Sequence, residues 1–463
     1  MSGIFRGLQI GISTLMAHQR AIDVTSQNIA NVNTPGYQRQ RVNFRELSGP
    51  SGVINPPLMG NGVHAQGISR FVTPFIDEQL RRQRGIQQHA STSENLLRDV
   101  ESVLTEPSGT GISASLDAYW AAWQDLTVRP VEESTRIALL QTGNQLAATI
   151  NEAHGFISEL RDNLGAQIRS RVDRINDIAA EIADLNTQIV QANARAGGPG
   201  GAIALEQRRD DLLFELSDIT DFRLAVDESG LARITIGNYA LVDEGGQRLI
   251  DLDESSQPIW TGNGAAVHTT SGELKALLEM RNETIPGILD QLNTLAMGLA
   301  ENVNKLHREG YGLNGETGLD FWVGEDAATL AVNPALFDAP ASIATAGEPN
   351  SVGDISVALS IAQLATQPSM GGDPPTVSIN GFFRSNITDL GLRIQHVSAS
   401  SESSKLVMNH LTDRRQAISG VSMDEEVANL LSYEKAFQAG ARIINVVDEM
   451  LDQVINRMGI VGR

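Results

Sequence analysis

The sequence predicts a mainly α-helical chain with paired coiled-coil helices at its two ends, a long helical-bundle domain, and a small β domain inserted at the far end. Three observations support this prediction. Apolar residues recur at alternating spacings of three and four near both termini, which is the pattern of a coiled-coil stripe. Similar stripes fill most of the middle, and the apolar period changes from helical spacing to two between 221 and 269. We therefore expect a terminal coiled-coil domain (1–37 and 422–463), an elongated helical domain (38–220 and 270–421) and a β domain (221–269).

The C-terminal helix is predicted over Met423–Met458. Ser422 stands three residues before Glu425, the spacing of a capping box that starts a helix, and Gly459 follows as a terminator. Such a helix would be roughly 50 Å long. Its apolar stripe needs a partner helix, and it consists of Leu430, Tyr433, Phe437, Gly440, Ile444, Val447, Leu451, Val454 and Met458.

The N-terminal helix supplies the expected partner. Its apolar residues fall seven apart, with Ile12 on the same face and a ridge of glycines that would let another backbone come close: Leu8, Leu15, Ile22 and Ile29, with Gly3, Gly7 and Gly11. Charged and polar residues such as Arg6 and Arg20 make a membrane span implausible. If the two ends pair, the middle of the chain is carried as an insertion between them.

The chain between the ends alternates helices with breaks. Thr34-Pro35-Gly36-Tyr37 fits a type II turn, and 38–70 is expected to be extended and partly β. Helices are predicted over 74–105, 131–196, 205–220, 271–307 and 379–417, with a Gly-rich hairpin at 197–201. Tyr119, Trp120 and Trp123 have helical spacing and are expected in the core, and carbohydrate stacking is the alternative.

Composition excludes several classes of function. A net charge of −21 argues against nucleic acid or an anionic membrane as a partner, and the absence of cysteine excludes a disulfide framework. No Sec-type signal peptide is evident at the N-terminus. No metal-ligand, phosphate-loop or nucleophile motif occurs, so we predict no catalytic residue, no metal site and no cofactor. Asp251, Asp253 and Glu254 lack the spacing of a calcium loop and are expected at a solvated strand end.

Several segments resemble one protein family. The stretch from Asn28 to Tyr37 resembles the N-terminal signature of bacterial flagellar axial proteins, which include rod, hook and hook-associated proteins. Ser419–Glu426 and Leu430–Ala439 are similar to the C-terminal signature of that family. Three internal segments, 119–126, 205–212 and 330–334, resemble the hook-associated proteins at the hook–filament junction. The resemblance spans most of the chain.

The resemblance implies a structural subunit that joins the hook to the filament and lets flagellin assemble. It implies self-assembly into a ring or helix, the hook protein on the proximal side, the second junction protein on the distal side, and an export chaperone at the C-terminal helix. It also implies an extracellular position in the flagellum, reached through the type III export channel without cleavage. The expected assembly interface combines the two stripes and the turn: Leu8, Ile12, Leu15, Ile22, Ile29, Asn31, Thr34, Pro35, Gly36, Tyr37, Leu430, Tyr433, Phe437, Ile444, Val447, Leu451 and Val454.

Two alternatives stay open at this point. The chain could be another axial component, a hook or distal rod protein, against which the internal motifs argue. A more distant alternative is an extracellular peptidoglycan hydrolase on an axial scaffold. The abundant Asp and Glu residues would allow a chance carboxylate pair, but the 221–269 insert is small and poor in convergent catalytic groups.

Overall fold

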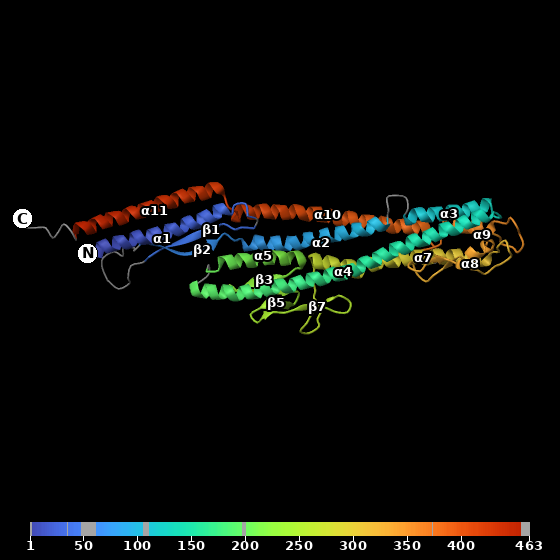
Figure 1. Cartoon of the computed structure of the whole chain (residues 1–463), viewed down its shortest axis with the longest axis horizontal. Helices are drawn as coiled ribbons and strands as arrows, with labels where there is room; N and C mark the ends of the chain where they lie inside the picture. Colours follow the sequence, from blue (N-terminus) through green and yellow to red (C-terminus); the bar gives the residue numbers. More distant parts are fainter. Residues whose placement is uncertain are drawn as a thin grey trace, which may run out of the picture.

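The computed structural model describes residues 2–34, 36–47, 62–104, 111–196, 201–372 and 374–454. The molecule is elongated, and helices run along most of its length (Figure 1). It consists of two parts. The terminal unit comprises the first and last helices and a β-hairpin, and the helical arm comprises the long helices between them.

The terminal unit pairs the two ends of the chain. Helix α1 (Ser2–Ala30) lies beside α11 (Met423–Asp452), and the two run antiparallel (Figure 1). Strands β1 (Gln40–Glu46) and β2 (Val63–Arg70) form an antiparallel hairpin that packs on α1. The predicted pairing of the terminal helices is therefore confirmed, whereas the predicted helix end at Met458 and Gly459 lies outside the described residues.

The helical arm is built on α4 (Glu133–Ala196), a helix of 64 residues. Its heptad residues, which include Ile168, Ile175, Ile182 and Ile189, are all buried, as the spacing predicts. Helix α2 (Pro74–Leu104) packs along α10 (Ile379–Ser419), while α3 (Ile112–Val128) and α5 (Ile203–Ile219) pack on α4. The hairpin expected between α4 and α5 lies mostly outside the described residues.

The helix predicted over 271–307 is interrupted. It consists of α6 (Glu273–Glu279), a π-helical turn at Met280–Thr284 and α7 (Ile285–Glu309). Gly272 begins it with a φ of +89°, and a Cβ there would lie 2.5 Å from the Ile219 carbonyl oxygen. Only glycine fits this junction, and Gly272, at the N-cap position, has no side chain that could cap the helix.

Short elements close the end of the arm that lies away from the termini. They are β9 (Trp322–Val323), β10 (Ala331–Val332), α8 (Pro334–Asp338), a 3₁₀ turn (Pro340–Ser342) and α9 (Ser356–Gln363). Beside them, Tyr119 and Trp123 are fully buried, and Trp322 donates its indole N–H to the Tyr119 hydroxyl at 3.1 Å. The aromatic segment therefore belongs to the core, and these rings are not exposed for stacking on a carbohydrate.

The small β region follows α5. A four-stranded antiparallel sheet has the order β3 (Arg223–Val226), β4 (Ala232–Ile236), β5 (Tyr239–Asp243), β6 (Gly246–Gln247). A two-stranded sheet pairs β7 (Ile250–Leu252) with β8 (Pro258–Trp260).

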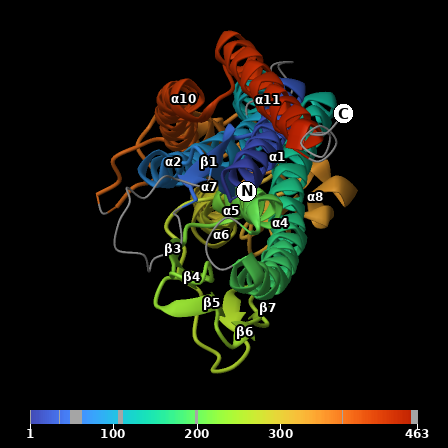
Figure 2. The same ribbon diagram turned by 90° about the vertical axis from the view of Figure 1, so that its left-hand side faces the viewer.

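The prediction that this region lies at the far end is wrong. It lies along the side of α4 (Figures 1 and 2). Two asparagines of α4 hold it there through the strand backbone. The Asn176 amide donates to the Ile250 carbonyl at 2.8 Å, and the Asn186 amide donates to the Ala232 carbonyl at 2.8 Å.

Candidate assembly interface

The buried stripe between α1 and α11 is made of small residues. A Cβ added at Gly7 would lie 3.1 Å from Val447 Cγ2, and one added at Gly11 would lie 2.7 Å from Ile444 Cγ1. A Cβ at Gly440 would in turn meet Thr14 Cγ2 at 3.2 Å. The glycines therefore let the two backbones approach closely, as the glycine ridge predicts.

The larger apolar residues of the predicted stripes flank this contact. Leu8, Leu15, Ile22 and Ile29 are half-buried, and Ile12 is exposed at 41%. On α11, Val447 is buried, and the other predicted residues are half-buried: Leu430, Tyr433, Phe437, Ile444 and Leu451, with Val454 just beyond the helix. Because the small residues take the centre of the helix pair, the large ones keep part of their apolar surface open to solvent.

A further apolar row on the terminal helices is more exposed than the predicted stripes. On α11 it includes Leu431 at 53% and Met450 at 50%, and on α1 it includes Phe5 at 58% and Met16 at 71%. The predicted site residues did not include these four, although Phe5 and Met16 lie eleven residues apart, which is close to three helical turns. Exposed apolar rows on two paired helices are typical of surfaces that pack against other chains.

The hairpin covers one face of the terminal unit. Ala17, Ala21 and Val24 of α1 form a small buried cluster with Val42 and Ala65 of the hairpin. The His18 ring lies 5.3 Å from that of Phe44 and 6.0 Å from that of Tyr433, so three elements meet at one imidazole. Burial lowers the pKa of His18, and its Nδ1 has no hydrogen-bond partner among the described residues.

A buried polar network joins the two ends of the chain where α1 ends and α11 begins. The Asn28 amide donates to the Glu426 carboxylate at 2.9 Å and to the Gln40 carbonyl at 2.8 Å, and its oxygen accepts from Tyr37 Oη at 3.0 Å. Arg39 Nε donates to Glu426 at 2.6 Å. Burial, together with the Glu426 charge, raises the pKa of Tyr37 to about 12.

This network gives both signature segments a physical role. Glu426 is only 2% exposed, and a buried carboxylate is stable only when donors surround it. Asn28 uses all four of its hydrogen-bonding sites, with Gln40 N–H as the fourth partner at 3.0 Å. Neither Asn28, Arg39 nor Glu426 was among the predicted site residues. Asn28 and Glu426 each stand at a position where the helical pattern of apolar residues calls for an apolar side chain. A polar residue at such a position is the signal that would have identified them.

The capping box expected at Ser422 is not formed. Ser422 occupies the N-cap position, but its side chain makes no capping hydrogen bond. Glu425 accepts from Arg39 Nη1 at 2.7 Å instead of bonding back to the cap. The start of α11 is thus bonded to Arg39, the residue that directly precedes β1.

The turn after α1 has the predicted form. Tyr37 N–H donates to the Thr34 carbonyl at 3.2 Å, and Gly36 has a φ of +81°, as the third position of a type II turn requires. Asn31 accepts from the Thr34 hydroxyl at 3.2 Å within the turn. Pro35 lies outside the described residues, and Gly36 faces α5, where its carbonyl accepts from Gln207 at 3.3 Å.

The described ranges hold no group of three or more His, Asp or Glu side chains that could bind a metal ion. None of the helices described for the chain is both long and apolar enough to cross a membrane.

Comparison with known proteins finds flagellar relatives along the whole chain. Residues 97–322 match the family described as the flagellar hook-associated protein FlgK helical domain. Residues 8–38 match the flagella basal body rod protein family, and residues 415–458 match the flagellar basal body rod FlgEFG protein C-terminal family.

Flagellar hook-associated protein 1 of Bacillus subtilis is 26% identical over 100% of both chains. That of Salmonella typhimurium is 23% identical over 96% of this chain and 98% of the relative. The flagellar hook protein FlgE of Borreliella burgdorferi is 38% identical, but over only 15% of this chain and 18% of the relative. The solved flagellar hook junction protein FlgK from Burkholderia pseudomallei has a TM-score of 0.65 at 14% identity, covering 74% of this chain and 100% of that one.

Proposed function

Because the chain belongs to the flagellar hook-associated protein 1 family, we propose that it is the structural subunit of the junction that connects the flagellar hook to the filament. The full-length alignment with members of that family carries this proposal. The hook-protein match covers only 15% of the chain, so an assignment as another axial component accounts for much less of the sequence. No observation favours a peptidoglycan hydrolase, and we infer a structural, non-catalytic role.

We propose that the terminal unit is the assembly domain. It includes the predicted ranges 1–37 and 422–463 and adds the hairpin 40–70, which packs on α1. The predicted interface residues, together with the exposed row that includes Phe5, Met16, Leu431 and Met450, would contact neighbouring copies. Burial of this surface between subunits would supply the free energy of assembly.

We further propose the partners and the route. In the assembled flagellum the subunit would contact copies of itself, the hook protein on one side and the second junction protein, hook-associated protein 3, on the other. Before secretion an export chaperone would cover α11, whose exposed apolar row suits a helix-binding groove. Export would follow the flagellar type III channel and leave the N-terminus uncleaved.

Imaging of flagella from cells in which the gene is deleted tests this function. We expect hooks without attached filaments, together with flagellin monomers in the medium, because flagellin would have no surface on which to polymerise. Complementation with the intact gene should restore filaments. Normal filaments in the deletion strain would refute the assignment.

A further inference from the structure

The terminal unit and the helical arm have separate apolar cores. The small core of the terminal unit consists of Ala17, Ala21, Val24, Val42 and Ala65, and the large core of the arm has no member in common with it among the described residues. Since apolar packing is what normally fixes two bodies relative to each other, the orientation of the terminal unit on the arm has to come from other contacts.

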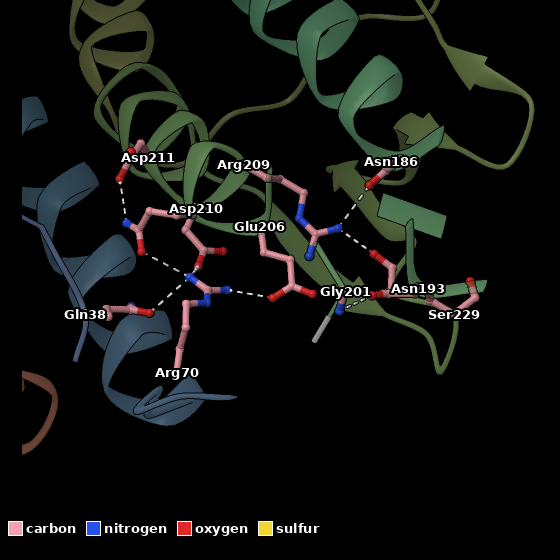
Figure 3. Close-up of polar contacts among 12 residues, drawn as sticks. Gln38, Arg70, Asn186, Asn193, Gly201, Glu206, Arg209, Asp210, Asp211 and Ser229 are labelled. Atoms are coloured by element: carbon pink, nitrogen blue, oxygen red, sulfur yellow. Dashed lines mark hydrogen bonds and ion pairs between the residues drawn. The ribbon is translucent and has the colours of Figure 1, made fainter. Parts of the chain in front are cut away.

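Arg70 supplies a polar contact between the two parts. It is the last residue of β2, and its side chain is only 8% exposed. Its guanidinium donates to the Asp210 carboxylate at 2.8 Å, to Glu206 at 3.2 Å and to the Gln207 side-chain oxygen at 3.2 Å, all on α5 (Figure 3). The same group donates to Gln38 of the terminal unit at 3.1 Å.

The next face of α5 extends this contact into the arm. Arg209 Nη1 donates to the Asn186 side-chain oxygen of α4 at 3.2 Å and to the Gly230 carbonyl, in the turn between β3 and β4, at 2.5 Å (Figure 3). Asn186 in turn accepts from Ala232 N–H at 3.0 Å. The segment from Glu206 to Asp210 therefore bonds to the hairpin through one face of α5, and to α4 and the β3–β4 turn through the other.

Further hydrogen bonds near Arg70 join the chain segments that connect the terminal unit to the helical arm. Arg39 N–H donates to the Ser419 carbonyl at 2.9 Å, and Phe71 N–H donates to the Arg39 carbonyl at 2.9 Å. The Thr73 and Ser419 hydroxyls lie 3.2 Å apart. These bonds hold the crossing segments to one another, whereas the Arg70 contacts and the bond from the Gln207 amide to the Gly36 carbonyl at 3.3 Å reach α5.

We propose that Arg70 is a positioning residue whose contacts with Glu206 and Asp210 set the angle between the terminal unit and the helical arm. A planar guanidinium with fixed donor directions suits this task, because it can satisfy two carboxylates and two amide oxygens only in one orientation of the hairpin. The inference concerns the isolated molecule. Its consequence, that Arg70 aims the assembly surface at neighbouring subunits, rests on the proposed function.

The experiment measures the distance between spin labels on the two parts. Because the chain contains no cysteine, Gln66→Cys on β2 and Ala180→Cys on α4, both at exposed positions, can be labelled without other changes. Pulsed electron paramagnetic resonance on the purified, labelled protein then gives the distribution of distances between the two spin labels. It is compared for the parent, Arg70→Met, Arg70→Lys and the control Arg208→Met, which removes an exposed ion pair between Arg208 of α5 and Glu181 of α4.

We expect Arg70→Met to move the maximum of the distribution and broaden it, while circular dichroism and the main melting transition stay unchanged. Arg70→Lys should return part of the population to the parent distance, and Arg208→Met should match the parent. An unchanged distribution in folded Arg70→Met would overturn the proposal, as would an equal change in Arg208→Met. If Arg70→Met does not fold, the isosteric double variant Glu206→Gln/Asp210→Asn is judged by the same criteria. None of these outcomes depends on the filament phenotype of the deletion strain.

Discussion

Replacing Gly11 by alanine should weaken the pairing of the terminal helices. The added Cβ would lie 2.7 Å from Ile444 Cγ1 and 3.4 Å from the Gly440 carbonyl oxygen, so the helices or the Ile444 side chain must move. Overpacking of this kind costs about 2 kcal/mol, and the better helix propensity of alanine stabilises the helix by up to about 1 kcal/mol. The net loss of about 1 kcal/mol corresponds to a roughly fivefold increase in the open population of the helix pair.

Amide hydrogen exchange of the purified monomer, followed by mass spectrometry, measures this change. Exchange in α1 and α11 should become about fivefold faster at short labelling times, and exchange in α4 should not change. The matched control is Gly155→Ala in α4, where a Cβ would meet no atom within 4 Å. That variant should gain about 0.5–1 kcal/mol from helix propensity alone. If Gly11→Ala slows exchange in the terminal helices, the close backbone contact does not exist and the reasoning is refuted.

Three further predictions concern the terminal unit. Phe437→Ala should leave the melting transition of the monomer nearly unchanged yet prevent stable filament attachment. The control Ile182→Ala, in the arm core, should destabilise the monomer by about 2–5 kcal/mol. Unfolding of the monomer by Phe437→Ala would contradict this prediction. Burial lowers the pKa of His18 below 6.5, so the folded terminal unit favours the neutral imidazole. The contribution of His18 to the stability of the terminal unit is therefore complete above pH 6.5 and is lost as the pH falls below that value. Exchange in α1, corrected for intrinsic rates, should therefore accelerate between pH 7 and 5 in the parent but not in His18→Phe, and equal acceleration in both would disprove the role of this imidazole. Asn28→Ala leaves the buried Glu426 carboxylate short of a donor, so the terminal unit should lose about 2–4 kcal/mol, measured by exchange, and an unchanged rate would show that the network is dispensable.

Local pattern was enough to predict most of the helical fold. In α4, the apolar residues repeat with so little interruption that their burial followed from spacing alone. The change of period after α5 likewise identified the β region. Its position was not predictable, because it depends on Asn176 and Asn186, whose amides bond to strand backbones far along the chain. A polar residue on a helix surface does not reveal such a partner in the sequence.

The terminal interface shows the same limit. Heptad spacing identified Leu8, Leu15 and Ile22 as one stripe of α1, yet these residues are only half-buried, and the closest contact between the helices lies at the glycine ridge beside them. Which of two neighbouring stripes faces the partner depends on how closely two backbones approach, and the small residues permit the closest approach. The link from Asn28 to Glu426 spans 398 positions, so no local pattern could pair them.

That span also determines when the terminal unit can form. A ribosome releases α1 first, but its partner α11 lies at the other end of the chain, so α1 has to wait for nearly all of synthesis before the pair can close. Helices α3, α4 and α5, whose contacts with one another are nearer in sequence, can fold in the meantime, whereas α2 waits for α10. Closure of the two ends is then the last folding event, and until it happens Asn28 and Glu426 each remain hydrated and separate. Any partner that binds α11 would keep the molecule in a state in which the helical arm is folded and the terminal unit is not.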